Sequence, residues 1–341
     1  MTVKVFAASK KIGGAPFWVA LICGPGLAPV AQAQMFKDGP LQAVHQQGSP
    51  AELQRLATDR LSAQPTDSQA VLALALAAVR GNDAVARRAA ISQAQSCVQQ
   101  QPQTAACHYA LGVVLGVQAM SEGMLKAARS AGAVKTALTQ AQMLEPSWYA
   151  ARSALVEFHL SAPGVMGGSS SRAAELAKAA PTPEQARVLQ ARVELQDSKF
   201  EPAITALTAL LSARDSEVAD DAAQWGFQAA IGLINDDKAT LAVPFLERLQ
   251  QQRPDAAAAP FGLARVRATA GAHEEAVRLF EQSASRKGAS MLPVDYRRGI
   301  ALEALGRKEE AKAAYSRFLA AGRGFKGSLD DARKRLDALG G

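Results

Sequence analysis

The sequence predicts an all-α fold, a right-handed solenoid of roughly six helix–turn–helix units closed by a C-terminal capping helix. The chain holds 73 alanines among 341 residues and only 5% aromatic residues, which favours closely crossing helices over a β-sandwich rich in aromatic and β-branched residues. Small residues also recur every 34 to 35 positions, the length of one helix–turn–helix unit. The hydrophobic fraction of 48% and the mean hydropathy of −0.03 exclude a disordered chain and a polytopic membrane protein.

The first 33 residues have the three parts of a secretory signal peptide. A lysine-containing start precedes a long apolar stretch, and Ala31 and Ala33 place small residues at a cleavage site. We expect residues 1–33 to be removed after Ala33, so that the mature protein is periplasmic or secreted. Prolines and glycines interrupt the apolar stretch, which argues against the alternative of a retained membrane anchor. Lipidation at Cys23 is a second alternative, disfavoured by the bulky Ile22 where a lipoprotein signal has a small residue.

Export would change both the charge and the redox setting of the chain. Loss of three lysines lowers the formal net charge from +7 to +4, which is too weak for a nucleic-acid footprint. Cys97 and Cys107 remain, and an even pair in an oxidising compartment is a candidate disulfide. This bridge would cross the turn at residues 101–102 and stabilise the fold by about 3 kcal/mol. The alternative is two small buried thiols at a helix contact.

The solenoid is expected over residues 49–339, after an extended lead-in over the Gln- and Gly-rich residues 34–48 and with its first helix near Pro50. An alanine marks one position in most units, and after Ala203, Ala242 and Ala311 larger apolar residues follow four and seven positions later. Small side chains at that position let two helices cross closely. The alanines at this position are Ala90, Ala203, Ala242, Ala276 and Ala311.

These small residues make the chain resemble the tetratricopeptide-repeat (TPR) family, over about residues 49–319. The first helix of one unit carries Leu111-Gly112-x₂-Leu115, and the two C-terminal units have Gly at the turn, Ala opening the second helix and a ring four residues later. Those residues are Gly271, Ala276, Phe280, Gly306, Ala311 and Tyr315. Two stretched units, around residues 107–134 and 146–173, resemble a subgroup of exported bacterial TPR proteins. That likeness implies no activity.

A capping helix is expected over residues 328–339, because the last repeat otherwise exposes the apolar face that a neighbour would cover. Ser328 is placed to cap this helix, and Asp331 to complete a capping box. Leu329, Ala332 and Leu336 fall on one face.

We find no catalytic or metal-binding constellation in the sequence, and we predict a non-enzyme without a cofactor. The four histidines are scattered singly, at positions 45, 108, 159 and 273. The Gly-rich segment 162–171 offers backbone N–H groups to an anion, but it follows a helix and lacks the Gly-Lys-Ser/Thr of a nucleotide loop. We expect a long turn from which Ser170 or Ser171 caps the next helix. The alternative is an accessory subunit or a small-molecule-binding protein that uses segment 162–171 and His159.

The resemblance implies that first helices line a concave groove in which a partner binds. It places two kinds of side chain there that carry binding energy in interfaces, aromatic rings and arginines. The groove candidates are Tyr109, Arg192, Phe227, Phe261, Arg265 and Tyr296. For the rings, the alternative is that they fill gaps between neighbouring repeats. Arg192 and Arg265 are harder to explain as core residues, and they suit an acidic side chain or C-terminal carboxylate on a peptide.

The expected function is therefore a periplasmic scaffold that binds another protein or an extended peptide and supports an envelope process such as assembly, secretion or cell-wall work. Nucleic acid is not expected as a partner, nor is stable membrane insertion after signal cleavage. A homo-oligomer is compatible with this role.

Overall fold

The computed structural model describes residues 35–81 and 83–340, and the predicted signal peptide therefore lies outside the described residues. Within these ranges the chain forms helices and no strand, apart from one isolated bridge between Ala256 and Lys287. The α-helices are α1 (Gly39–Gln47), α2 (Pro50–Ala63), α3 (Ser68–Arg80), α4 (Ala84–Gln100), α5 (Ala105–Ser121), α6 (Met124–Leu144), α7 (Tyr149–Ser161), α8 (Ser170–Lys178), α9 (Pro183–Gln196), α10 (Phe200–Leu210), α11 (Ser216–Asn235), α12 (Val243–Gln252), α13 (Ala258–Thr269), α14 (His273–Ala284), α15 (Val294–Ala304), α16 (Lys308–Ala321) and α17 (Lys326–Ala338). Three short 3₁₀ turns join them, η2 (Gly164–Met166), η3 (Ala239–Ala242) and η4 (Ala289–Met291).

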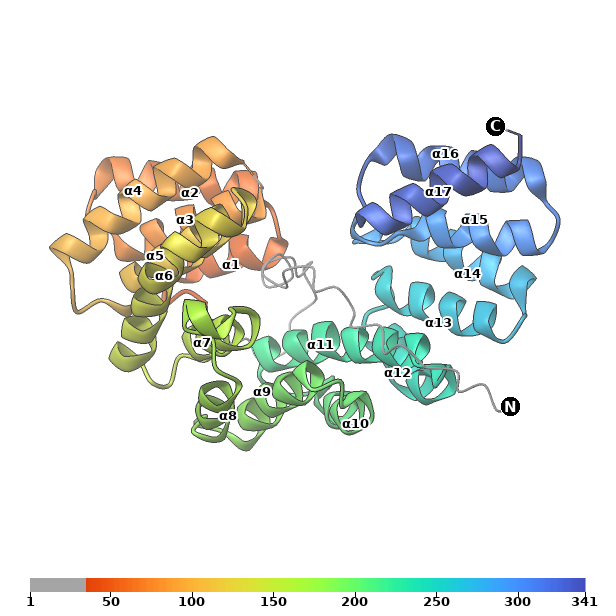
Figure 1. The fold of residues 1–341 in the computed structure, drawn as a ribbon. Helices are drawn as coiled ribbons and strands as arrows, with labels where there is room; N and C mark the ends of the chain where they lie inside the picture. The colour runs from red at the N-terminus through yellow and green to blue at the C-terminus, as the bar shows by residue number, and fades with distance from the viewer. Residues whose placement is uncertain (1–34, 82, 341) are drawn as a thin grey trace.

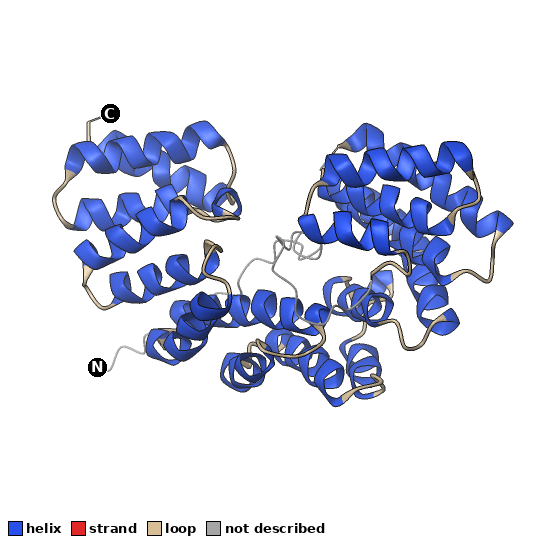
Figure 2. Ribbon diagram, turned by 180° about the vertical axis from the view of Figure 1, so that it is seen from behind, coloured by secondary structure: helices blue, strands red, loops and turns tan. Residues whose placement is uncertain are grey.

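Consecutive helices pack as seven pairs, from α3 with α4 to α15 with α16, after a leading pair α1 and α2. The pairs follow an arc with α1–α6 at one end, α7–α12 in the middle and α13–α17 at the other end (Figure 1). The view from behind shows helices throughout the described part of the chain (Figure 2). The all-α helix–turn–helix solenoid predicted from the sequence is confirmed, with one unit more than expected.

Glycine on a first helix and alanine on a second helix explain how closely each pair crosses. A Cβ on Gly112 would lie 2.7 Å from Leu138 Cδ2 on α6, and one on Gly299 would lie 2.6 Å from the Tyr315 ring on α16. The repeating alanines are fully buried, Ala203 and Ala311 among them. The periodic small residues are therefore the contact points of the helix pairs.

The expected extended lead-in over residues 34–48 is wrong, because this segment contains helix α1. Asp38 caps the helix by accepting a hydrogen bond from Leu41 N at 2.9 Å, and Pro40 occupies its first turn. Phe36 and Leu41 are buried in the core. An Asp followed by Pro is a helix start signal, which the Gln- and Gly-rich composition obscured.

The capping helix is confirmed, but its start differs from the expected Ser328. Helix α17 begins at Lys326, with Phe325 at the N-cap position and no side-chain cap. Asp331 completes no capping box, since it accepts hydrogen bonds from Arg335 at 2.6 Å and from the Tyr296 hydroxyl at 2.9 Å. Ala332 is buried against the last repeat. Asp331 therefore forms hydrogen bonds with Arg335 and Tyr296 instead of a capping box.

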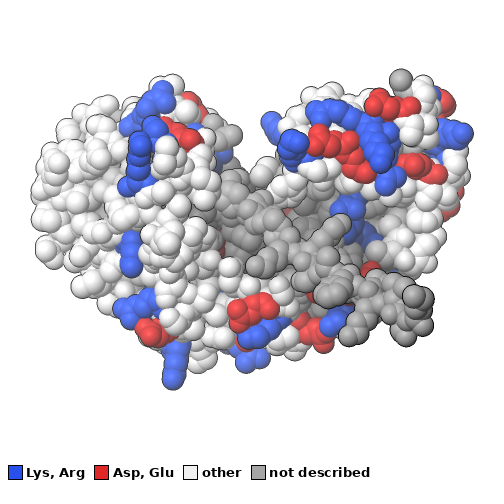
Figure 3. Space-filling view, in the orientation of Figure 1, with Lys and Arg blue, Asp and Glu red and all other residues white. Residues whose placement is uncertain are grey.

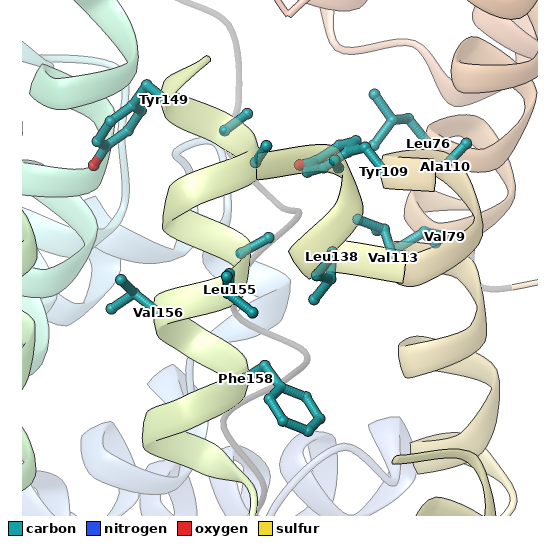
Figure 4. Packing of buried hydrophobic residues seen from close by; sticks show 14 of the residues in the cluster. Leu76, Val79, Tyr109, Ala110, Val113, Leu138, Tyr149, Leu155, Val156 and Phe158 are labelled. Carbon is teal, nitrogen blue, oxygen red and sulfur yellow. The ribbon is translucent and has the colours of Figure 1, made fainter. Parts of the chain in front are cut away.

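Buried hydrophobic side chains connect each helix pair with the next and form a core that runs along the solenoid. On α5, Tyr109 and Val113 lie near Leu76 and Val79 of α3 and near Leu138 of α6 (Figure 4). One buried cluster continues in this way from Phe36 to Trp225. Two further clusters cover the α10–α13 region and the C-terminal end.

Cys97 at the end of α4 and Cys107 at the start of α5 are paired in the structure, with a Cα–Cα distance of 5.4 Å. This distance is within the range that a disulfide requires. The predicted bridge is therefore compatible with the fold, and it would tie the two helices together across their turn.

In the described part of the chain, no helix combines the length and the apolar character needed to cross a membrane.

Candidate functional site

The first helices of successive pairs form one continuous inner layer. Helices α7, α9, α11, α13 and α15 each contact the next one in this series. In Figure 1 α11 lies on the inner side of the arc, and α10 lies toward its outer side. Residues on the free side of these helices therefore share one concave surface, which we call the inner layer.

Three of the four candidate rings pack within the protein. Tyr109 is 4% exposed, with its ring centroid 4.7 Å from that of Trp148. Phe261 is 2% exposed and lies against Phe280, with centroids 5.7 Å apart. Tyr296 stacks on Phe318 at 5.3 Å. Tyr109 therefore packs between neighbouring repeats, as the alternative interpretation held, whereas Phe261 and Tyr296 pack against the second helix of their own pairs.

Phe227 is the ring that remains partly exposed on the inner layer. Its centroid lies 6.3 Å from that of Phe261. Ile231, one turn further along α11, is also partly exposed. The two side chains provide an apolar contact area on this helix.

Arg192, a candidate for contacting a partner, is instead a fully buried internal residue. Its Nη2 donates to Glu157 Oε2 at 2.8 Å, and its Nη1 lies 3.4 Å from Asp221 Oδ2. Its guanidinium also lies over the Trp225 ring, 4.7 Å from the centroid. Burial opposes the charge, but Asp221 and Glu157 outweigh it and raise the pKa of Arg192 above its ordinary value. Arg192 therefore joins α7, α9 and α11, and its acidic partners come from its own chain.

Four carboxylates gather at the start of α11, namely Asp215, Glu217, Asp220 and Asp221, and we call them the acidic end of α11. Asp215 caps the helix by accepting from Glu217 N at 3.0 Å, and Asp220 pairs with Arg253 at 2.6 Å. Burial, followed by the charges of Asp215, Asp221 and Asp220, raises the pKa of Glu217 to about 8. The described residues contain no group of three or more His, Cys, Asp or Glu that is suited to a metal ion.

Two positively charged side chains lie toward the C-terminal end of the inner layer, Arg265 on α13 and Arg297 on α15. We call them the inner arginine pair. Both are partly buried. Arg265 Nη2 donates to Asn235 Oδ1 at 2.9 Å, and Arg297 lies over the Tyr296 ring at 5.3 Å. Burial and the nearby charge of Arg297 lower the pKa of Arg265 to about 10. Burial likewise lowers the pKa of Arg297.

The inner arginine pair has no carboxylate partner within ion-pair distance among the described residues. Within the described part of the chain, Arg297 Nε is buried without a hydrogen-bond partner. The sequence-based candidates included Arg265 but missed Arg297. The signal that could have found it is its position beside Tyr296, about one repeat after Arg265 in the chain.

The C-terminal end of the arc carries many charged side chains of both signs on the face seen in Figure 3, whereas the α1–α6 end is mostly uncharged there. Much of this charge is neutralised in pairs, such as Arg335 with Glu303 at 2.9 Å and Arg307 with Glu310 at 2.7 Å. The inner arginine pair differs from these neighbours because neither arginine forms an ion pair among the described residues, although the charge of Asp331 favours the protonated form of Arg297.

The Gly-rich segment 162–171 is a turn with its own internal contacts. Val165 at its tip is 97% exposed. Ser169, rather than the expected Ser170 or Ser171, caps α8 by accepting from Arg172 N at 3.2 Å. A side chain on Gly168 would overlap the Ala162 carbonyl oxygen, so this tight turn requires glycine.

His159, which the alternative interpretation coupled to this segment, is 5% exposed and packs edge-on against Phe158. Burial, then the charges of Lys135 and Arg172, lower its pKa. A solvated turn beside a packed, neutral histidine offers no arrangement for acid–base chemistry. The geometry therefore gives the alternative of an accessory subunit or small-molecule site at this segment no support.

A comparison with protein-family models finds no match, and a comparison with curated proteins finds none either. Solved structures do match. Cut9 in the APC/C hetero-tetramer Cut9–Hcn1 is similar with a TM-score of 0.52 and 10% identity, over 87% of this chain and 54% of that one. A monomeric IFIT1 mutant with Gppp-AAAA is similar with a TM-score of 0.56 and 12% identity, over 87% of this chain and 68% of that one. The human IFIT1 dimer with PPP-AAAA gives a TM-score of 0.54 at 12% identity, over 87% and 70% of the two chains.

Identities this low show the fold alone. The chain spans about half of the Cut9 chain that it matches. What it shares with these proteins is the architecture, and the protein therefore has the fold of the TPR-containing helical solenoids.

Proposed function

We propose that this protein is a non-enzymatic scaffold that binds a segment of another protein along its inner layer. The proposal is supported by a solenoid that presents its first helices as one surface, and by side chains on that surface that are not used internally. Repeat proteins of this architecture use such extended concave surfaces for binding.

One observation carries the proposal, the inner arginine pair. Arg265 and Arg297 lie on the contacting first helices α13 and α15, and burial, followed by the charge of Arg297, lowers the pKa of Arg265 to about 10. Bringing like charges together under partial burial costs free energy. In the buried Arg192 cluster the chain offsets this cost with ion pairs to Glu157 and Asp221. The inner arginine pair forms no ion pair among the described residues, and Asp331 acts on Arg297 only through its charge. A binding partner can provide the missing opposite charge.

The setting we propose is the periplasm, after removal of residues 1–33, and the process is one of envelope assembly, secretion or cell-wall work. The lysine-containing, apolar N-terminus and the pair Cys97–Cys107 support export, because disulfides persist in oxidising compartments. The matched structures give two kinds of precedent, since Cut9 is solved with Hcn1 and IFIT1 with Gppp-AAAA or PPP-AAAA. The net charge of the mature chain, +4 after loss of three lysines, favours a protein partner over a nucleic acid.

Site-specific photocrosslinking in the cells that make the protein tests this function. Gln228 is exposed on α11, two turns before Asn235 and on the same side of the helix. A photoreactive residue at this position is expected to give a discrete protein adduct. The same residue at Glu247, exposed on the second helix α12, serves as the matched control and is expected to give no such adduct. Identical adducts from both positions would rule out the inner layer as the binding surface.

A further inference from the structure

We infer that the second helices α4, α6 and α8 form a docking surface for a membrane that contains anionic phospholipid. The protein lies on this membrane without spanning it. We call the exposed side chains of these helices, together with the turns that precede them, the outer cationic surface. This inference goes beyond the proposed function and does not rest on the inner layer.

Large apolar side chains are exposed where each of these second helices begins. Val85 in the first turn of α4 is 66% exposed, and Leu125 in the first turn of α6 is 68% exposed. Val165, in the turn before α8, is 97% exposed. Stacked helix pairs bring the starts of their second helices to the same edge of a solenoid. Exposed apolar side chains that share one surface mark an interaction site.

The starts of α4 and α6 lie beside each other, because both act on Glu122 in the turn before α6. Lys126 of α6 pairs with this carboxylate at 3.6 Å. A hydrogen bond from Gln118, followed by the charges of Lys126 and of Arg88 on α4, lowers the pKa of Glu122. The exposed apolar side chains of α4 and α6 therefore belong to one surface.

The turn that carries Val165 lies against the middle of α6. A Cβ on Gly167 would lie 3.3 Å from Lys135 Cδ, and Lys135 is roughly 16 Å along α6 from the first residue of that helix. The backbone holds this turn, since Ser169 N donates to His159 O at 2.9 Å. A fixed turn therefore presents Val165 beside a lysine of the same surface.

The charge of these second helices complements an anionic surface. Together α4, α6 and α8 carry seven Lys or Arg residues and a single acid, Glu175. Arg88 and Arg129 are exposed and form no ion pair within the described ranges. The second helix α14 has the opposite balance, with three Glu residues and one Arg. The excess of cations is therefore a property of α4, α6 and α8 and is not shared by every second helix.

A lipid surface matches both properties at once. Peripheral membrane binding combines apolar side chains that enter the headgroup region with the attraction of Lys and Arg to anionic lipids. Nucleic acid would neutralise the cations through its phosphates, but it would leave Val85, Leu125 and Val165 without an apolar environment. The combination of exposed apolar side chains and unpaired cations therefore favours the membrane.

Co-sedimentation of the mature protein with vesicles tests the inference. One set of vesicles is phosphatidylcholine alone, and the other contains phosphatidylcholine and phosphatidylglycerol in equal amounts. We expect saturable binding to the anionic vesicles, at least tenfold tighter than to the neutral ones and weakened by added salt, which screens charge. Equal binding to both sets, or no binding to the anionic set, overturns the inference.

The cations are tested with the variant Arg88→Gln/Arg129→Gln, which is expected to weaken binding to anionic vesicles at least tenfold. Arg248→Gln/Arg278→Gln, on exposed positions of the second helices α12 and α14, removes the same charge. It is the matched control and is expected to bind like the wild type. Circular dichroism melting of each variant shows whether it folds. Undiminished binding by the first variant, or an equal loss in both, overturns the inference.

The apolar contact is tested with Val165→Trp. The emission of the new tryptophan, after subtraction of the wild-type spectrum, is expected to shift to shorter wavelength with anionic vesicles, because the side chain leaves water. Leu241→Trp, before α12 and 48% exposed, is the control and is expected to show no shift. An unchanged emission at position 165 in the presence of bound vesicles overturns the inference.

A ten-nucleotide oligoadenylate distinguishes a lipid surface from a general polyanion site. We expect its binding, measured by fluorescence anisotropy, to be weaker than that of the anionic vesicles and to be the same in Arg88→Gln/Arg129→Gln. Tighter binding of the oligonucleotide through these two arginines overturns the inference in favour of nucleic acid.

Discussion

The buried arginines of this protein differ in whether nearby acidic side chains compensate their charges. Arg192 is enclosed with Glu157, Asp221 and Ser153, so its charge and its donors are matched from within. The inner arginine pair has no such match among the described residues. The Arg192 cluster stabilises the packing of neighbouring repeats, whereas the inner arginine pair keeps hydrogen-bond donors that a partner could use. The sequence pattern places Arg192 and Arg265 on equivalent first-helix positions and cannot tell these roles apart, because depth of burial depends on how successive repeats stack.

The Arg192 cluster makes a stability prediction. Arg192→Met leaves Glu157 buried and unpaired, and removing one partner of a buried ion pair costs about 3–5 kcal/mol. Adding Glu157→Gln to this variant removes the uncompensated charge and is expected to recover part of the loss. Urea unfolding followed by circular dichroism measures both. A loss below about 1 kcal/mol for the single change would contradict a stabilising role for the cluster.

His45 makes a prediction about acid stability. Burial and the charge of Arg80 lower its folded-state pKa to about 3, whereas an unfolded histidine titrates near 6.5. Between these values the unfolded chain binds a proton that the folded chain does not, so stability is lost as the pH falls from about 6.5 toward 3. Between pH 7 and pH 5 we expect His45 to account for a loss of about 1–2 kcal/mol.

The variant His45→Gln cannot take up this proton, and it should lose correspondingly less stability over the same interval. Urea unfolding of the wild type and the variant at pH 7 and pH 5 measures the difference. Equal acid losses in the two proteins would show that His45 is not the responsible group.

At the scale of elements, small residues determine the helix pairs, and this is the level at which sequence analysis succeeds best. Ala276, Ala311 and Gly112 lie at crossings where predicted, since a close approach tolerates few residue types. Predictions from the sequence were wrong at two places, the N-terminal segment before α2 and the start of α17. The Gln- and Gly-rich composition obscures helix α1. Ser328 does not cap α17, because the helix already begins at Lys326, and Asp331 binds Arg335 and Tyr296 instead of completing a capping box.

A glycine at a helix crossing and an exposed glycine predict opposite effects of the same substitution. Gly112→Ala would place a Cβ 2.7 Å from Leu138 Cδ2, and overpacking of this kind costs about 1–3 kcal/mol. Gly132→Ala, on the neighbouring helix α6, meets no atom within 4 Å and is expected to stabilise by about 0.5–1 kcal/mol through helix propensity. Thermal melting of the two variants shows the difference in sign. Two shifts in the same direction would contradict the crossing model.

The bridge between α4 and α5 predicts the behaviour of its two thiols. In mature protein purified from an oxidising compartment, titration of the unfolded and unreduced chain is expected to find no reactive thiol. Cys97→Ala/Cys107→Ala is expected to lower the stability by about 3 kcal/mol, because the bridge restricts the unfolded chain. Two titratable thiols in the wild type would show that the bridge does not form.

At the scale of the whole molecule, the repeats join into an arc with the carboxylates at one end of α11 and the inner arginine pair near the other. The sequence predicted the solenoid and its capping helix, because both follow from local patterns that recur. It could not predict the charge distribution of the inner layer. Arg192 is buried by the stacking of α7, α9 and α11, and Arg297 joins Arg265 through the stacking of α13 and α15. Such contacts between distant segments leave no periodic signal.

The central claim is that a protein segment binds the inner layer through the inner arginine pair, and crosslinking from position 228 in three backgrounds tests it most directly. In the wild type and in Arg248→Gln/Arg278→Gln, we expect the same discrete protein adduct. In Arg265→Gln/Arg297→Gln, we expect its yield to fall at least tenfold while the melting temperature stays unchanged. An adduct of equal yield in all three backgrounds would contradict the claim.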